Sequence, residues 1–378
     1  MKALVLDAEG RTGIVRDVPI PEPQSNEVLV RVRAIALNPV DALYTAYPLG
    51  KSGRILGSDF AGEIVVSGSS VPSSSQLKAG SRVAGFLQGA CSKNDRPGAF
   101  AEYLVVPWDL VWRINDLSFE EAATISLCAL TAAQALFLRL ELQAPFSLSQ
   151  KQPHDDLKHE SISIVINGGS TSVALYAAQL AKASPTPVSL FGTASTRHRS
   201  FLSKAPYRYD YLVDYRDEDW SNQILQPNDG RGLDFGFDCI SEGSTVLKTA
   251  RTLRQGAKLA VVRSRQGQAW NTSRDELGVE PSYGAVWEGL GEDVEYVGMT
   301  LPANAQAREF AVAFYAWLSE GGKIVSNPVR LMPGGLEKVV KDGFTLLGTG
   351  SVNDRRMERR EEEYMRPVSG EKLVYQIK

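Results

Sequence analysis

The alternation of hydrophobic and polar positions changes its period along the chain. Residues 28–35 alternate with the period of a β-strand, and further short apolar runs lie at 62–66, 81–86 and 101–106. Turns rich in Gly, Ser and Pro separate these runs. Because several short strands divided by such turns are typical of a small β-barrel, the pattern predicts a barrel in about the first hundred residues.

Beyond Phe119 the apolar residues take helical spacing as far as Leu140, and Ser118 with Glu121 forms a capping pair at the start. A polar hinge follows at 145–158. After it we expect helices that begin at Thr171 and near Val246, the second ending at Gly256. The expected strands lie at 162–166, 188–191, 211–214, 234–240 and 258–262. This alternation predicts a parallel, doubly wound sheet.

The end of the chain is expected to return to the first domain. Residues 369–377 indicate a terminal strand, and the mixed-charge run 353–363 before it indicates a solvated helical excursion. The resulting division places 1–149 with 303–378 in a substrate-binding and catalytic domain, and 150–302 in a dinucleotide-binding domain.

Composition excludes several kinds of partner. The 378 residues carry 41 Lys and Arg against 44 Asp and Glu, a net charge of −3, so the basic surface of a nucleic-acid binder is missing. No apolar run is long enough to span a bilayer, and acid follows the first residues too soon for a secretory signal. We therefore expect a cytoplasmic protein that binds neither nucleic acid nor membrane.

The few cysteines and histidines argue against a disulfide framework and against a metal site. The cysteines are widely scattered with no paired spacing: Cys91, Cys128 and Cys239. The histidines lie among polar or basic residues and are expected to be solvated: His154, His159 and His198.

The stretch 162–174 carries the clearest chemical signal. A β-branched run ends in Gly168 and Gly169, the hydroxyl residues 170–172 follow, and helical spacing then continues. A strand, a tight glycine turn and a helix N-terminus aim unpaired N–H groups and the positive end of the helix dipole at one point. This corner predicts a site for the phosphates of a nucleotide cofactor.

The end of the next strand indicates which nucleotide. Proteins that bind NAD place an Asp or Glu there for the ribose 2′-hydroxyl, but residues 190–193 contain no acid. Residues 195–199 follow as Ser-Thr-Arg-His-Arg, and Arg pairs bidentately with a phosphate. The pattern favours NADPH over NADH.

Four segments, at 27–32, 36–41, 56–62 and 98–103, are similar to those of the medium-chain dehydrogenase/reductase superfamily. The resemblance covers essentially the whole chain. It implies an α/β fold with an N-terminal GroES-like β-barrel domain and a doubly wound parallel-sheet (Rossmann) NADP-binding domain. Zinc-dependent members carry Cys where Asn38 stands and His-Glu where Ser58 and Asp59 stand, so the resemblance implies a zinc-free protein.

Four further motifs narrow the resemblance: Asn38-Pro39-Val40-Asp41, Gly168-Gly169-Ser170-Thr171, Asp214-Tyr215-Arg216 and the terminal Ser-Gly-Glu-Lys-Leu-Val at 369–374. Together they resemble the trans-acting enoyl reductases of fungal polyketide pathways, of the lovastatin type. This resemblance implies NADPH-dependent reduction of an α,β-unsaturated polyketide thioester, with a polyketide synthase as partner.

The resemblance also implies the site residues. The pyrophosphate would be held by Gly168, Gly169, Ser170, Thr171, Ser172 and Val173, and the 2′-phosphate by Ser195, Thr196, Arg197 and His198, with Tyr215 beside the adenosine. The nicotinamide half would lie near Val40, Asp41, Ala42, Leu43, Val368 and Ser369, and Val262 would also bind the cofactor. Thr131 would be catalytic, and the substrate would lie along Thr131, Ala132, Ala133, Gln134, Ala135, Leu136, Phe137 and Leu138.

Leu43 departs from the family pattern, because lovastatin-type enzymes carry a Lys at this position that contacts cofactor and substrate. Leu supplies neither a charge nor a proton, and Lys51, Tyr44 and Tyr47 are candidates for that role. Two other functions stay open: a free-standing quinone or enone reductase, and a non-reducing relative that binds a polyketide as a scaffold or cyclisation template. Monomer and homodimer also stay open, with 294–300 as a candidate dimer edge.

Overall fold

The computed structural model describes residues 1–91, 95–148, 161–296, 299–349, 351 and 360–378. Their contacts group into two units. The first comprises Met1–Leu127, Trp287–Gly322 and Ser326–Lys378, and the second comprises Cys128–Val286 and Lys323–Val325. The domain boundaries expected from the sequence stay a prediction.

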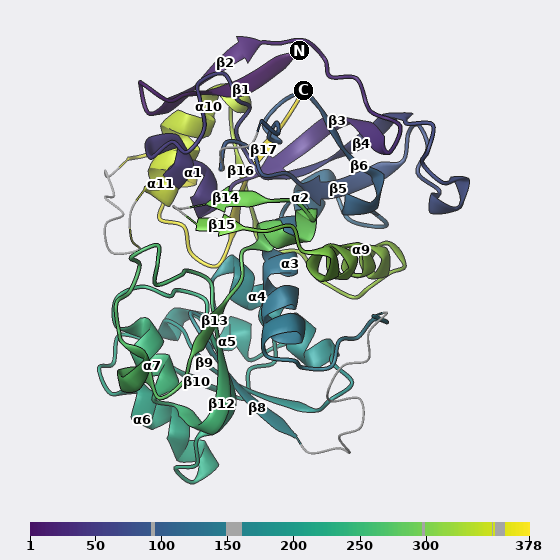
Figure 1. Ribbon diagram of the computed structural model, residues 1–378. Coiled ribbons are helices and arrows are strands. Elements are labelled where there is room, and N and C mark those ends of the chain that lie inside the picture. The colour runs from purple at the N-terminus through teal and green to yellow at the C-terminus, as the bar shows by residue number, and fades with distance from the viewer. Residues whose placement is uncertain (92–94, 149–160, 297–298, 350, 352–359) are drawn as a thin grey trace. The chain divides into compact units, whose positions relative to one another are not determined.

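A seven-stranded sheet forms the centre of the first unit (Figure 1). Its strands follow the order β16 (Val329–Met332), β17 (Lys372–Gln376), β3 (Glu27–Ala36), β4 (Asp59–Ser67), β5 (Arg82–Phe86) and β7 (Val111–Arg113), and β6 (Tyr103–Pro107) also pairs with β3. Pairs of strands form two smaller sheets: β1 (Lys2–Asp7) with β2 (Thr12–Asp17), and β14 (Val294–Tyr296) with β15 (Met299–Leu301). The short strands predicted in the first hundred residues are thus confirmed.

The terminal strand returns to the first unit, as predicted. Residues Val374–Gln376 pair antiparallel with Ala34–Ala36 of β3, and β17 also pairs in parallel with β16. The mixed-charge run falls largely outside the described residues, since 352–359 are not described. The described remainder has a single 3-10 turn at Glu363–Met365.

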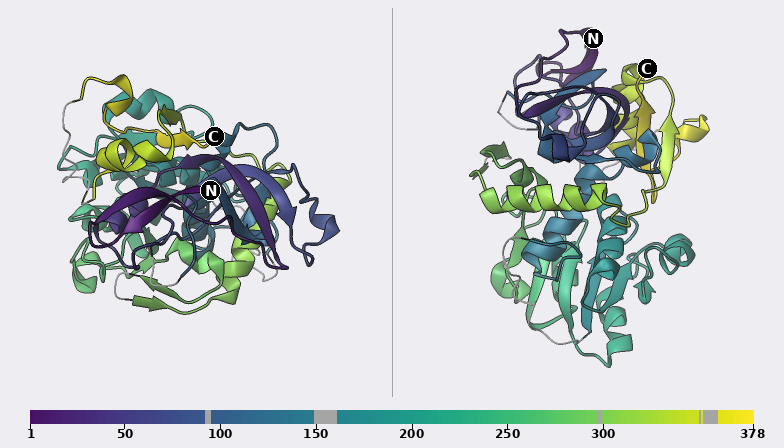
Figure 2. Two further views of the ribbon diagram at one scale, coloured as in Figure 1. Left: turned by 90° about the horizontal axis from the view of Figure 1, so that it is seen from above. Right: turned by 90° about the vertical axis from the view of Figure 1, so that its right-hand side faces the viewer.

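The helices of the first unit are short apart from one. They are α1 (Pro39–Ala46), α2 (Phe119–Ala123), α9 (Ala305–Ser319), α10 (Leu336–Lys338) and α11 (Thr345–Leu347). The long helix α9 is seen along its length in the right-hand view of Figure 2, and its buried face carries Phe310, Phe314 and Tyr315. Ser118 and Glu121 form the predicted capping box at the start of α2.

A six-stranded parallel sheet forms the second unit. Its order is β10 (Tyr211–Val213), β9 (Val188–Thr193), β8 (Ile162–Asn167), β11 (Leu233–Asp238), β12 (Leu253–Val261) and β13 (Pro281–Tyr283), and every pairing is parallel. The accompanying helices are α3 (Ser126–Ala133), α4 (Ser172–Ala183), α5 (Arg199–Leu202), α6 (Trp220–Leu225), α7 (Thr245–Ala250) and α8 (Arg274–Leu277). Helix α4 packs on β8 and β9, and α7 packs on β11 and β12. The predicted doubly wound sheet is confirmed, with the strand order reversing between β8 and β11.

Three expected elements differ from the structure. The helix expected from Phe119 to Leu140 is divided, because the Thr124 hydroxyl bonds back to the Glu121 carbonyl at 2.7 Å and α2 ends there. Helix α7 ends at Ala250 rather than Gly256, since Leu253 already pairs with Leu233 in the sheet. Gly256 instead lies within β12 at a φ of +76°.

The candidate dimer edge is the third difference. The stretch 294–300 was expected at the edge of the nucleotide-binding sheet, but its described residues belong to the small antiparallel sheet of β14 and β15 in the first unit. The edge strands of the six-stranded sheet are β10 and β13. The expected dimer edge is therefore wrong.

Candidate functional site

The glycine turn after β8 has the geometry of a phosphate site. Gly168 takes a φ of +78°, which L-residues rarely adopt, and a side chain there would overlap Ile240. Thr171 follows as the N-cap of α4, its hydroxyl accepting from the Ala174 N–H. The strand, turn and helix predicted from the sequence are thus all present.

Hydrogen bonds within the turn decide which donors remain for a ligand. The Gly168 N–H donates to the Thr193 hydroxyl at 3.0 Å, and the Gly169 N–H donates to the Thr193 carbonyl at 2.7 Å. The N–H groups of Ser170 and Val173 have no partner in the described part of the chain. These two donors at the start of α4 fit a phosphate group.

Beneath the turn lies a buried tyrosine that sequence reasoning missed. Tyr209 is 4% exposed, its hydroxyl has no hydrogen-bond partner among the described residues, and it lies where a side chain on Gly169 would touch it at 3.3 Å. Its ring fills the space that a Cβ on Gly192 would need. The glycines therefore leave space at the turn, and the Tyr209 hydroxyl lies beside this space. This arrangement fits a bound phosphate group.

The residues expected at the 2′-phosphate lie after β9, in the turn 196–198. Ser195 is buried, while Thr196 and Arg197 are exposed and His198 is partly buried. The Thr196 N–H and hydroxyl both donate to Asp214, at 3.1 and 2.8 Å. An acid therefore does reach this patch, but it comes from the end of β10 rather than β9.

The Asp214 carboxylate stays ionised at neutral pH. Partial burial raises its pKa, but hydrogen bonds from the N–H of Arg216 and from Thr196 outweigh this and lower the pKa to about 2. Tyr215 beside it is 49% exposed, and the Arg216 guanidinium lies 4.7 Å from the centre of its ring. The residues 214–216 thus form a charged, largely exposed segment beside the turn 196–198.

In the first unit, the residues at the start of α1 form a buried hydrogen-bond network with β4. The Asn38 amide donates to Asp59 at 2.9 Å, and the Asn38 N–H donates to Asp41 at 2.7 Å. Ser58 donates to Asp41 at 2.6 Å, and the Lys372 ammonium lies 2.6 Å from Asp59. All five side chains are at most 3% exposed. Sequence reasoning missed Lys372, which lies 313 residues from Asp59.

The pKa of Asp41 is strongly shifted in this network. Burial raises its pKa to about 7, although the hydrogen bonds from Ser58 and Asn38 oppose the shift. Val40, Asp41, Ala42 and Leu43 all lie in the helix α1, and Leu43 is partly buried. Of the residues considered in place of the family Lys, Tyr44 is buried and Tyr47 and Lys51 are exposed.

The segment with Val368 and Ser369 is held by a buried arginine. Arg330, 4% exposed, donates to the carbonyls of Arg366 and Pro367 and pairs with Glu371. Val368 and Ser369 are partly buried between these anchors.

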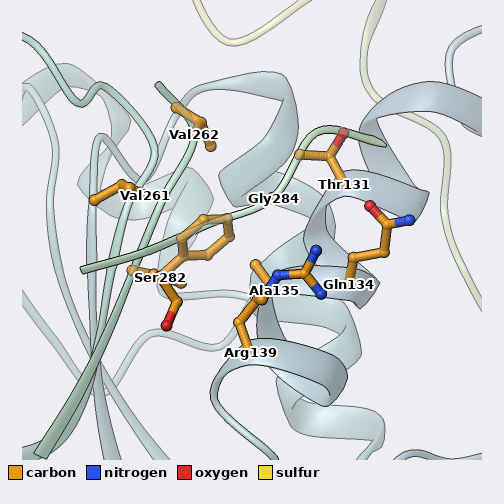
Figure 3. Close-up of a pocket in the computed structure, with 10 residues that line it drawn as sticks. Thr131, Gln134, Ala135, Arg139, Val261, Val262, Ser282 and Gly284 are labelled. Carbon is orange, nitrogen blue, oxygen red and sulfur yellow. The ribbon is translucent and has the colours of Figure 1, made fainter. Parts of the chain in front are cut away.

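A pocket opens within the second unit beside Thr131 (Figure 3). The empty space in the pocket, including the solvent at its mouth, has a volume of ≈ 240 Å³. Four polar side chains line it: Thr131, Gln134, Arg139 and Ser282. The apolar lining comes from Ala135, Phe237, Ala260, Val261 and Val262, and Gly284 completes it.

The structure brings together part of the expected substrate stretch. Thr131, Gln134 and Ala135 line the pocket with Val262, whereas Ala132, Ala133, Leu136 and Phe137 are buried and Leu138 is partly buried away from its lining. Arg139, Ser282 and Gly284 were missed, because no motif marks them. A π-helical turn over Gln134–Arg139 positions the first of these.

Two further observations concern metals and membranes. The described residues contain no group of three or more His, Cys, Asp or Glu side chains able to hold a metal ion. Every described helix is too short or too polar to cross a bilayer. Cys91, Cys128 and Cys239 are buried and free, and His154 and His159 lie outside the described residues.

Together, the β-rich first unit and the parallel sheet with its phosphate corner define a dehydrogenase or reductase of the medium-chain type. The model of the alcohol dehydrogenase GroES-like domain matches residues 24–116. The crystal structure of CurK enoyl reductase has the same fold, with a TM-score of 0.72 at 17% identity over 99% of this chain and 98% of that one. Mycobacterial Rv1454c, solved with NADPH, gives a TM-score of 0.66 at 18% identity over 100% of both chains.

The sequence comparison is more specific. The trans-enoyl reductase ACTTS2 of Alternaria alternata is 32% identical over 382 residues, covering 100% of this chain and 98% of its own. The chain belongs to the trans-enoyl reductase family.

Proposed function

We propose that this protein is a trans-acting enoyl reductase that uses NADPH, without zinc, to reduce the α,β-unsaturated thioester of a polyketide carried by a partner synthase in the cytoplasm. The observation that carries the proposal is the turn 168–173, whose remaining donors and two glycines fit a dinucleotide phosphate. Membership of the trans-enoyl reductase family supports the reaction. Rv1454c, a protein of the same fold, was solved with NADPH.

In this proposal NADPH supplies the hydride for the β-carbon of the substrate. The Ser170 and Val173 N–H groups and the N-terminus of α4 bind the pyrophosphate. Arg197 and His198 lie in the turn 196–198 and are proposed to bind the 2′-phosphate. Thr131 lines the pocket with Val262, and in this proposal its hydroxyl faces the substrate. Negative charge then develops on the substrate carbonyl oxygen, which hydrogen-bond donors stabilise without a metal, and a proton from water reaches the α-carbon to complete the reduction.

The residues of the first unit do not fit a zinc ion. The Asn38 amide nitrogen donates to Asp59 and the Ser58 hydroxyl donates to Asp41, and the Lys372 ammonium pairs with Asp59. Zinc sites in proteins are built from Cys, His and carboxylate ligands. In the proposed reaction, charge on the substrate carbonyl oxygen is therefore stabilised by hydrogen-bond donors rather than by a metal ion at this position.

The test compares substrates with the purified protein. NADPH consumption is followed by absorbance with a crotonyl thioester on N-acetylcysteamine, the same acyl group on a synthase carrier domain, and a simple quinone. We expect turnover with the thioesters, faster on the carrier, and slower turnover with NADH. No turnover of any enoyl thioester would refute the proposal, and turnover of the quinone alone would indicate a free-standing quinone reductase.

A further inference from the structure

The hydroxyl of Tyr209 is a buried donor that the second unit does not use. The side chain is 4% exposed, and its hydroxyl has no hydrogen-bond partner in the described part of the chain. Burial raises the pKa of this phenol well above its usual value, so the hydroxyl stays protonated and can donate. A buried donor without a partner is costly to a folded protein, so its retention points to a ligand that supplies an acceptor.

The surroundings of Tyr209 fix where the phenol lies. Its backbone N–H donates to the Leu202 carbonyl at 3.1 Å. A Cβ on Gly192 would lie 2.5 Å from the ring, so the phenol occupies space that the missing side chain leaves at the end of β9. The hydroxyl lies beside Gly169, 3.3 Å from the position that a Cβ there would take. The ring therefore extends from the end of β9 to the glycine turn.

The polar groups of the turn bond to one another and not to this hydroxyl. The Thr193 carbonyl accepts from the Gly169 N–H at 2.7 Å, and the Thr193 hydroxyl accepts from the Gly168 N–H at 3.0 Å. The same hydroxyl donates to Asn167 at 2.6 Å. These bonds hold the turn and leave the phenol outside their network. The acceptor that Tyr209 lacks is thus one that a ligand at the turn can bring.

The turn itself has no charged side chain to meet an anion. Residues 168–173 read Gly-Gly-Ser-Thr-Ser-Val, so a phosphate there is met by neutral donors and by the positive end of the α4 helix dipole. The N–H groups of Ser170 and Val173 supply two such donors. A hydrogen bond to a charged oxygen is stronger than one between neutral groups, so a further donor from Tyr209 adds substantially to the binding of an anion.

We propose that Tyr209 is a further cofactor-binding residue, whose hydroxyl donates a hydrogen bond to a pyrophosphate oxygen of the dinucleotide. The inference rests on the proposed function, which assigns a dinucleotide to this turn. The hydroxyl is covered in this structure, so the oxygen reaches it through a small shift of the turn, which Gly168 and Gly169 allow because they carry no side chain. The pyrophosphate is favoured over the 2′-phosphate because the hydroxyl lies beside Gly169 and not in the turn 196–198.

Y209F tests the proposal, because it removes the hydroxyl and keeps the ring. Two quantities are measured on the full chain: the melting temperature without ligand, and the dissociation constant of NADPH by calorimetry. We expect the melting temperature of Y209F to stay unchanged or to rise, since a buried donor without a partner is removed. We expect NADPH binding to weaken by roughly 10- to 100-fold, since a hydrogen bond to a charged group is lost. A tyrosine that only fills space would not give this combination.

Y207F is the matched control. Tyr207 is 2% exposed and lies two residues from Tyr209, and its ring packs on Phe201 with the ring centres 4.7 Å apart. The substitution removes the same atom from a tyrosine of similar burial in the same segment. We expect Y207F to bind NADPH as tightly as the wild type.

Two smaller ligands identify the phosphate that the hydroxyl contacts. ADP-ribose carries the pyrophosphate without the 2′-phosphate, and adenosine 2′-monophosphate carries only the 2′-phosphate. We expect Y209F to weaken binding of NADPH, NADH and ADP-ribose by similar factors and to leave binding of adenosine 2′-monophosphate unchanged. A loss for NADPH and adenosine 2′-monophosphate without a loss for ADP-ribose would overturn the assignment to the pyrophosphate.

The outcomes distinguish this inference from the proposed function. If Y209F binds NADPH as tightly as the wild type, loses no more affinity than Y207F, or melts at a lower temperature, the inference is overturned and the reductase assignment stays intact. A wild type that binds NADPH without reducing any enoyl thioester would refute the reductase assignment, while the comparison with Y209F would still decide the role of Tyr209. A wild type that binds neither NADPH nor ADP-ribose would overturn both.

Discussion

The buried pair of Lys372 and Asp59 gives the sharpest prediction about stability. The two side chains are 2% and 0% exposed, with the ammonium 2.6 Å from the carboxylate. Two unit charges at this distance attract by about 6 kcal/mol at an effective dielectric constant of about 20, and desolvation of both groups offsets much of this. Removal of one partner leaves the other charge buried and alone. We therefore expect K372M to lower the free energy of unfolding by about 3–5 kcal/mol.

The other contacts of Asp59 explain why the loss is concentrated there. One carboxylate oxygen accepts from the Asn38 amide at 2.9 Å, and the other accepts from the Leu127 N–H at 2.8 Å. Lys372 also donates to the Thr124 carbonyl at 3.2 Å. The pair thus joins β17 and β4 to the beginnings of α1 and α3, and the loss of Lys372 loosens all of these contacts at once.

Urea unfolding followed by tryptophan fluorescence and circular dichroism measures the effect. D59N/K372M removes both charges and is expected to lose less stability than K372M alone, since no isolated charge remains. K248M is the control, because Lys248 pairs with the 94% exposed side chain of Glu218 at 2.8 Å and should cost at most about 1 kcal/mol. A K372M variant as stable as K248M, or a double variant less stable than K372M, would refute the reasoning.

Three further predictions concern the pKa of Asp41, the glycine turn at Gly168 and the carboxylate of Asp214. The pKa of Asp41 is about 7 in the folded protein and ordinarily 3.8, so between these pH values the folded state binds one proton more than the unfolded state. The free energy of unfolding of the wild type relative to D41N should therefore fall by about 1.4 kcal/mol per pH unit as the pH rises from ~4 to ~7, measured by urea titrations at several pH values. If wild type and D41N showed the same dependence on pH, this prediction would be wrong. G168A places a side chain at a φ of +78° against Ile240, so we expect a loss of roughly 1–2 kcal/mol in thermal unfolding and weaker NADPH binding, whereas an unchanged melting temperature would count against the turn geometry. D214N removes a negative charge beside Thr196, where the 2′-phosphate of NADPH is proposed to bind. It should tighten binding of NADPH up to about fivefold at low salt and leave binding of NADH, which has no 2′-phosphate, unchanged. Equal effects on both nucleotides in calorimetry would argue that Asp214 does not face the 2′-phosphate.

The phosphate corner was predictable because its requirements are local. Gly168 must adopt a positive φ, Thr171 must cap a helix, and both follow within four residues of a β-branched strand. The six-stranded sheet followed from the same alternation of strand and helix. The short strands of the first unit were recognised by their period and by their turns.

The features that were not predicted depend on contacts between residues far apart in the sequence, or on a change of helix type that alters which residues share a face. Arg139 lies on the face of Gln134 only because of the π-turn, and a regular helical period would have placed it elsewhere. Lys372 reaches Asp59 across 313 residues, so no local pattern reveals the pair. The described residues of the stretch 294–300 belong to β14 and β15, which pair with each other, because a short apolar run does not specify its partner strand.

Asn38, Ser58 and Asp59 stand where zinc-dependent members of the superfamily carry Cys and His-Glu. This difference changes what the first unit can contribute to the proposed reaction. Asn38 and Ser58 bond to carboxylates, and Lys372 provides the positive charge that offsets Asp59. A metal ion at this position would have to displace a buried ammonium, and it would find no thiolate or imidazole among Asn38, Ser58 and Asp59. What remains is Asp41, an acid whose pKa burial raises to about 7 and which accepts hydrogen bonds from the Ser58 hydroxyl and the Asn38 N–H. In the proposed reaction this unit can therefore contribute protons and hydrogen bonds, while the hydride would come from the dinucleotide that we propose binds to the second unit.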